Sequence, residues 1–138
     1  MIKFITIFLA RYDANTRTLV YTNAGHNPPL LIRPTNGSGA IRLNPTGAAI
    51  GLTESFTFRE SSIRLEPGDY LLLYTDGATE AGEPGVREFG ETRLEEWMAG
   101  HAALAPKALI DELWGTLRNF TRSNALRDDL TLIAAKVT

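Results

Sequence analysis

The spacing of the apolar residues changes once along this chain, and that change constrains the fold more than any other feature. As far as residue 75, apolar residues alternate with polar ones or form short runs bounded by turn residues, which is typical of strands. After Gly85 they recur at three- and four-residue spacing, which is typical of amphipathic helices. The sequence therefore predicts strands first, helices late, and a final strand over residues 130–137.

The first half of the chain predicts a series of strands joined by turns. Residues 2–12 and 19–25 flank a polar turn, so a hairpin is expected there. Apolar side chains occupy both parities of residues 2–12, which predicts a strand covered on both faces. Further strands are predicted over residues 29–33, 41–43, 56–65 and 70–75.

Two helices are predicted after residue 85. The first places Leu94, Trp97 and Met98 at helical spacing and has a plausible stop at Gly100. Pro106 suits the first turn of the second helix. We therefore expect one α+β domain over residues 1–138, with a mostly antiparallel sheet and two helices on one face.

Composition excludes several classes of protein. At 138 residues and 43% hydrophobic, the chain fits one soluble globular domain. A net charge of -2 argues against nucleic-acid binding, and no stretch is long enough for membrane insertion. A signal peptide is the alternative for the apolar start, but Arg11 and Asp13 follow where a cleavage site needs small residues. Without cysteines the chain has no disulfide or thiolate site, and we expect it in the cytoplasm.

Carboxylates lie at the ends of two predicted strands. Asp76 follows residues 70–75, and Asp128 and Asp129 precede residues 130–137. If these strands are antiparallel neighbours, their acidic residues meet at one edge of the sheet. Hard cations such as Mg²⁺ and Mn²⁺ prefer such oxygen ligands, and Gly77 would leave space for a hydrated ion. The alternative is that these residues only form turns or caps.

Four segments in order resemble the bacterial SpoIIE-type serine phosphatases, which are metal-dependent type 2C protein phosphatases. The segments are NAGHNPPLL, PGDYLLLYTDGATEA, FGETRL and RDDLTLIAAKV, which begin at residues 23, 67, 89 and 127. The resemblance implies a sheet sandwich flanked by helices and a dinuclear Mn²⁺ or Mg²⁺ site. It also implies phosphoserine or phosphothreonine substrates on a small regulatory protein, such as an anti-sigma-factor antagonist.

The resemblance carries roles to individual residues. Asp76 and Asp128 match the metal-binding aspartates of the family's TDG and DD segments, and Asp129 matches a neighbour that orients or caps. Asn23 and His26 lie in the family's AGHNPP segment. His26 would contact the phosphorylated substrate or, alternatively, bond only within its own turn. A role in local geometry is expected for Thr75, Gly77 and Glu80. A phosphate-receiving patch, or simply solvated side chains, is expected for Arg118, Arg122 and Arg127.

The chain also departs from the family pattern. These phosphatases have further metal ligands in upstream Gly-Asp and Asp-Val-Ser-Gly-His-Gly-like segments, and the one Gly-Asp here, at Gly68, belongs to a turn. We therefore expect the C-terminal portion of a phosphatase domain, with at most one weakly bound ion and little or no activity alone. The alternative is a non-catalytic binding module. Exposure of Phe4, Phe8 and Leu9 would then favour self-association through an open sheet edge.

Overall fold

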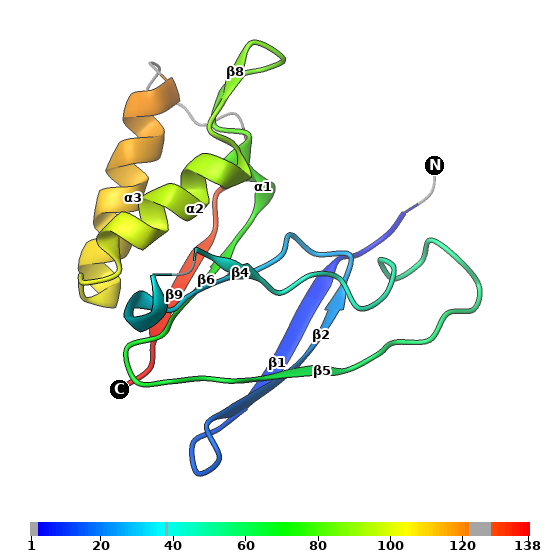
Figure 1. Cartoon of the computed structure of the whole chain (residues 1–138). Helices are drawn as coiled ribbons and strands as arrows, with labels where there is room; N and C mark the ends of the chain where they lie inside the picture. Colours follow the sequence, from blue (N-terminus) through cyan, green and yellow to red (C-terminus); the bar gives the residue numbers. More distant parts are fainter. Residues whose placement is uncertain (1–2, 38, 122–127) are drawn as a thin grey trace. The chain divides into compact units, whose positions relative to one another are not determined.

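The computed structural model describes residues 3–37, 39–121 and 128–138 (Figure 1). The chain divides into two compact units, each built from two separate segments. The expectation of a single domain stays a prediction. Unit 1 comprises Met1–Pro28 and Leu43–Glu66, and unit 2 comprises Pro29–Arg42 and Pro67–Thr138. The chain therefore crosses from one unit to the other after residues 28, 42 and 66.

Unit 1 is built around a three-stranded antiparallel sheet. Its order is β1 (Ile7–Asp13), β2 (Thr18–Ala24) and β5 (Ser61–Arg64). The predicted hairpin is confirmed, and the Asp13 carboxylate stabilises its turn by accepting hydrogen bonds from two backbone N–H groups that follow it. Because β1 pairs only with β2, it forms an edge of this sheet.

The prediction that the first strand is covered on both faces is wrong. Leu9 is 68% exposed and Phe4 is 57% exposed, while Phe8 is half-buried and stacks on Tyr21 with ring centroids 5.5 Å apart. The apolar residues on both faces of β1 are suited to packing against other elements. Unit 1, however, contains no described helix that could cover either face. The expected exposure of Phe4 and Leu9 is confirmed.

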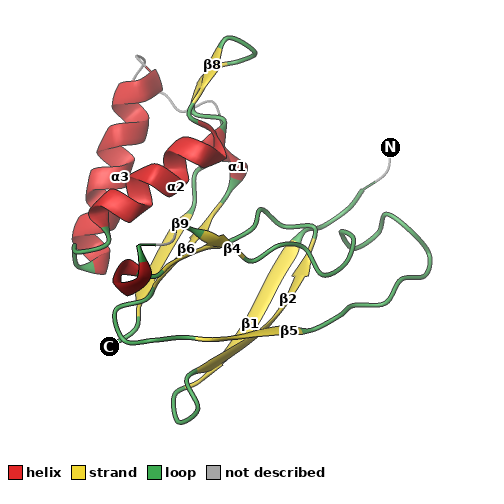
Figure 2. Cartoon of the chain, in the orientation of Figure 1, coloured by secondary structure: helices red, strands yellow, loops and turns green. Residues whose placement is uncertain are grey.

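Unit 2 contains a four-stranded antiparallel sheet, drawn in yellow beside the helices in Figure 2. The strand order is β4 (Ile41–Arg42), β3 (Leu30–Ile32), β6 (Tyr70–Tyr74) and β9 (Leu132–Lys136). A small hairpin of β7 (Gly82–Glu83) and β8 (Arg87–Glu88) follows the short helix after β6.

The helices of unit 2 are η1 (Pro34–Asn36), α1 (Asp76–Thr79), α2 (Gly90–His101) and α3 (Pro106–Thr121). The two long ones, α2 and α3, cover one face of that sheet (Figure 1). Alternate residues of β3 and β6 pack with the apolar stripes of α2 and α3 into one core, whose fully buried members include Leu30, Tyr70, Leu72, Leu94, Met98, Leu109, Leu113 and Leu117. The predicted α+β class is confirmed. No described helix has the length and apolar character needed to cross a membrane.

Candidate metal centre

The end of β6 and the beginning of β9 lie side by side in unit 2. Their antiparallel register pairs Tyr74 with Leu132, which confirms the predicted neighbour relation of these strands. Residues that follow β6 therefore meet residues that precede β9 at one edge of the sheet.

Three carboxylates meet at this edge. Carboxylate oxygens of Asp76, Glu80 and Asp128 all lie within 4.8 Å of one another, and all three residues are exposed. Asp76 and Asp128 were expected to meet, whereas Glu80 was expected to have only a local geometric role. Asp76 begins α1, and the N–H of Glu80 donates to the Asp76 carbonyl at 2.8 Å. One turn of helix places residues four apart on the same side, so Asp76 and Glu80 face the same way. Their i, i+4 spacing in the sequence was the feature that could have predicted a place for Glu80 in the cluster.

Close backbone packing brings Asp128 to the cluster. Its Oδ1 accepts a hydrogen bond from the N–H of Asp129 at 2.8 Å, which fixes the turn before β9. A Cβ atom added to Gly77 would lie 2.5 Å from the Asp129 carbonyl oxygen, closer than any side chain tolerates. Glycine at residue 77 is therefore required for α1 and this turn to approach each other. The carboxylate of Asp129 is not part of the described cluster.

The donor set fits a hard divalent cation. It consists of three carboxylates, with no described histidine in the group. Within residues 3–37, 39–121 and 128–138, none of the three forms an ion pair with a basic side chain. Three like charges this close repel one another, and a cation between them would offset that repulsion. Oxygen-only ligands suit Mg²⁺ and Mn²⁺.

The strand that leads into the cluster ends on a buried tyrosine that stays uncharged. Tyr74, the last residue of β6, is buried, and burial, followed by the charge of Glu91, raises the pKa of its hydroxyl to about 12. Arg42 forms ion pairs with both Glu91 and Glu95 of α2. The three clustered carboxylates have no such basic partner among the described residues.

Asn23, near the end of β2, and His26, in the loop that follows, are joined by hydrogen bonds of their own. Asn23 is fully buried, donates from Nδ2 to the Leu43 carbonyl at 3.0 Å, and accepts at Oδ1 from the His26 N–H at 2.8 Å. The His26 Nδ1 lies 2.9 Å from the Asn27 carbonyl, which is the contact within its own turn. Both residues belong to unit 1, whereas the carboxylates belong to unit 2. A substrate contact by His26 stays a prediction.

The arginine patch also stays a prediction. Arg118 is exposed near the end of α3, and Arg122 and Arg127 lie outside the described residues. Sequence reasoning missed two further arginines. The guanidinium groups of Arg87 and Arg93 lie 4.4 Å and 5.2 Å from the centroid of one phenylalanine ring at the end of α3.

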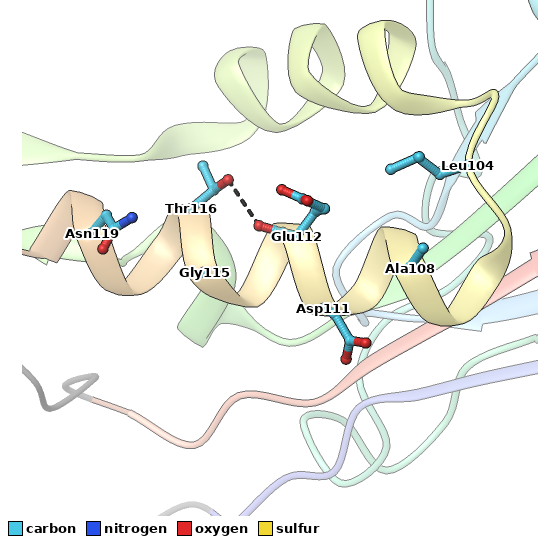
Figure 3. Close-up of a pocket in the computed structure, with 7 residues that line it drawn as sticks. All are labelled: Leu104, Ala108, Asp111, Glu112, Gly115, Thr116 and Asn119. Atoms are coloured by element: carbon cyan, nitrogen blue, oxygen red, sulfur yellow. Dashed lines mark hydrogen bonds between the residues drawn. The ribbon is translucent and has the colours of Figure 1, made fainter.

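A hollow lies along α3 (Figure 3). It has a volume of about 460 Å³ and is lined by Leu104, Ala108, Asp111, Glu112, Gly115, Thr116 and Asn119. None of the three clustered carboxylates lines this hollow.

Comparison with known proteins decides the family. The profile described as Stage II sporulation protein E (SpoIIE) matches residues 2–138. The chain belongs to the SpoIIE family. The resemblance to this family is therefore confirmed. The assignment of Asp76 and Asp128 to the family's metal-binding positions stays a prediction.

Relatives of this SpoIIE-family chain are longer than the chain itself. Phosphoserine phosphatase RsbU of Bacillus subtilis is 30% identical over 136 residues, which cover 96% of this chain and 39% of RsbU. The SiaA-PP2C domain of Pseudomonas aeruginosa has the same fold, with a TM-score of 0.78 and 23% identity over 95% of this chain and 51% of that one. The Mn-presoaked phosphatase domain of SpoIIE from Bacillus subtilis has a TM-score of 0.67 and 20% identity over 96% and 56%. The chain thus spans about half of each of these two structures.

Proposed function

We propose that this SpoIIE-family chain carries metal-binding carboxylates of a protein serine/threonine phosphatase. The observation that carries the proposal is the approach of Asp76, Glu80 and Asp128 to within 4.8 Å at the edge of the sheet in unit 2. The name of RsbU as a phosphoserine phosphatase and the manganese presoak of the SpoIIE domain support it.

The residues of this chain have different roles at this site. Asp76 and Asp128 hold a Mn²⁺ or Mg²⁺ ion, and Glu80 adds a third carboxylate from the same turn of helix. Gly77 keeps the backbone close enough for Asp128 to reach, since a larger residue would push the Asp129 carbonyl away. A divalent ion, when bound, supplies Lewis-acid stabilisation of a phosphoryl group and lowers the pKa of water.

Turnover requires ligands beyond these three. A two-metal phosphatase site places its ions about 3.5–4 Å apart and clamps both the attacking and the leaving oxygen. One small cluster of exposed carboxylates suits a single ion. We propose that the remaining ligands come from a segment outside this sequence, and that the 138-residue chain alone has little or no activity.

The proposed substrate is phosphoserine on a cytoplasmic regulatory protein of the anti-sigma-factor antagonist type. The name of RsbU supports the phosphoserine part of this proposal. The arginines of the β7–β8 hairpin and α2 support an anionic protein partner. The hairpin base, where the Phe89 N–H donates to the Ala81 carbonyl at 2.8 Å, is one residue from Glu80. Arg87 lies in β8 and Arg93 in the first turn of α2, the two elements on either side of Phe89.

Titration with Mn²⁺ tests the site in the chain itself. We expect the wild-type chain to bind Mn²⁺, with binding abolished in Asp76→Asn and in Asp128→Asn, because asparagine keeps the size of the side chain but removes its charge. Asp129→Asn is the matched control, since it removes one charge from the next residue, which lies outside the cluster. Circular dichroism should show all four proteins folded. Equal affinities across the series would refute the site.

Hydrolysis of a phosphoserine peptide tests the reaction. In a longer protein that includes this chain and the missing ligands, activity should depend on Mn²⁺ and disappear with Asp76→Asn. The 138-residue chain should show little turnover in excess Mn²⁺. Strong hydrolysis by the chain alone would show that the ligands are wrongly assigned. Inactivity of the longer protein as well, with Mn²⁺ bound, would favour the non-catalytic binding module.

A further inference from the structure

Thr75 lies between β6 and α1 and uses its hydroxyl in an unusual way. It is the residue before the first turn of α1, with φ -93° and ψ 166°. At this position a threonine hydroxyl commonly accepts a hydrogen bond from a free N–H of the helix. The side chain of Thr75 makes no such bond. Its hydroxyl is directed across the sheet to the segment that precedes β9.

Three hydrogen bonds join Thr75 to that segment. Its N–H donates to the Thr131 carbonyl at 3.2 Å, and its Oγ1 accepts from the Thr131 N–H at 3.0 Å. The same Oγ1 donates to the Asp129 carbonyl at 3.1 Å. The hydroxyl therefore donates to Asp129 and accepts from Thr131. Asp129 directly follows Asp128 in the chain.

The start of α1 explains why a side chain is needed here. In a regular antiparallel ladder the Thr131 N–H would donate to the carbonyl of its partner on β6. The Thr75 carbonyl instead accepts from the Ala78 N–H at 3.0 Å as α1 begins. The Thr75 hydroxyl takes the place of that carbonyl and continues the ladder for one further residue.

The Asp129 carbonyl is consequently fixed from two sides. The Thr75 hydroxyl donates to it, and Gly77 allows it to lie where a Cβ atom would be only 2.5 Å away. Asp128 is the residue just before this carbonyl, and its carboxylate also accepts from the Asp129 N–H. The position of the Asp128 side chain relative to Asp76 therefore depends on how firmly this peptide group is held.

We infer that Thr75 is a positioning residue for the metal site: its hydroxyl holds the 128–131 segment so that the Asp128 carboxylate reaches Asp76 and Glu80. This inference rests on the proposed function, because it concerns affinity for the divalent ion at that cluster. Groups that orient metal ligands typically change metal affinity about 10–100-fold when removed. A residue that served only the fold would change the unfolding midpoint and leave the affinity of the folded protein unaltered.

Mn²⁺ titration of Thr75→Val and Thr75→Ser in the 138-residue chain tests the inference. Valine keeps the branched shape and removes both hydroxyl bonds, so its Mn²⁺ dissociation constant should rise about 10–100-fold. Serine keeps the hydroxyl and should restore an affinity close to that of the wild type. Thr79→Val is the matched control, since its hydroxyl bonds only to the Asp76 carbonyl in its own helical turn, at 3.2 Å. Its affinity should change much less.

Thermal unfolding without metal, measured on the same proteins, separates the outcomes. Wild-type affinity in Thr75→Val, with or without a lower midpoint, would overturn the positioning role while leaving the proposed function intact. Failure of Thr75→Ser to restore affinity would also overturn it, because the hydroxyl would then not be the group that matters. If the wild-type chain bound no Mn²⁺ and Asp76→Asn behaved identically, both the proposed function and this inference would fall.

Discussion

The two units of this chain differ in how much of their apolar surface is buried. Unit 2 packs α2 and α3 on one face of its sheet, and Leu94, Leu109 and Leu113 have no exposed surface. Unit 1 has a sheet of similar size but no described helix. Large apolar side chains of unit 1 remain exposed: Phe4, Ile5, Ile7, Leu9, Tyr12, Ile50, Leu52 and Phe58.

This difference in burial indicates which unit is the more suitable support for a metal site. Catalytic and metal-binding side chains need a rigid base to keep their geometry. Asp76, Glu80 and Asp128 all belong to the unit that has a continuous core of its own. The apolar face of β1 instead suits contact with a further layer of protein.

Truncation of a core leucine should give the largest difference between the units. Leu113→Ala removes a fully buried side chain from unit 2 and should lower the free energy of unfolding by about 2–5 kcal/mol. Leu9→Ala removes the same atoms from β1, where most of the side chain already contacts solvent, and should change it by less than about 0.5 kcal/mol. Denaturant unfolding of both variants measures this. Equal losses would mean that β1 is buried in solution and would break the comparison.

Alkaline pH should expose a second, smaller contrast. The folded pKa of Tyr74 is about 12, above the ordinary value of about 10, so the folded state holds its proton more firmly than the unfolded state does. Stability from this group is complete below pH 10 and is lost as the pH rises from 10 to 12. Two pKa units correspond to at most about 2.7 kcal/mol.

Tyr74→Phe checks the alkaline effect, since it removes the titrating hydroxyl. The variant should lose less stability than the wild type between pH 10 and 12. Burial also raises the pKa of Tyr70, so part of the alkaline loss should persist in the variant. An unchanged pH profile in Tyr74→Phe would show that its hydroxyl reaches solvent in the folded protein.

The smallest effect on stability, and a clear one on association, is expected at the edge of unit 1. We propose that β1 makes the chain self-associate, because exposed edge strands with apolar side chains recruit other chains. Leu9→Lys should reduce the apparent mass in light scattering at high concentration, with a change in unfolding free energy below about 0.5 kcal/mol. A wild-type chain that is monodisperse and monomeric at high concentration would contradict the proposal.

The strand pairing behind the site could be predicted from sequence because two signals agreed. The apolar run over residues 70–75 ends at Asp76, and the apolar run over residues 130–137 begins just after Asp129. Antiparallel pairing then follows from the order of strand ends, and the structure confirms it. The strand predicted over residues 56–65 was too long, since β5 covers only Ser61–Arg64 and Phe56 packs edge-on against Phe58.

The contribution of α1 could not be predicted in the same way. A helix of one turn is too short to show a repeating apolar pattern, and Asp76 followed by Gly77 is equally typical of a turn. Because α1 was not predicted, Glu80 was not expected to lie beside Asp76. The bonds of Thr75 were also hidden, because they depend on which backbone carbonyl the helix start uses.

The interleaving of the two units limits how the carboxylate-bearing half could be transferred or inherited. Because the chain crosses between units after residues 28, 42 and 66, no single contiguous stretch of the gene encodes unit 2. A gene fragment that began at residue 67 would keep Asp76, Glu80 and Asp128 but would omit β3, whose Leu30 and Ile32 belong to the core beneath α2 and α3. Recombination that moves these acids together with the whole of unit 2 must therefore also carry residues 43–66 of unit 1, which include β5.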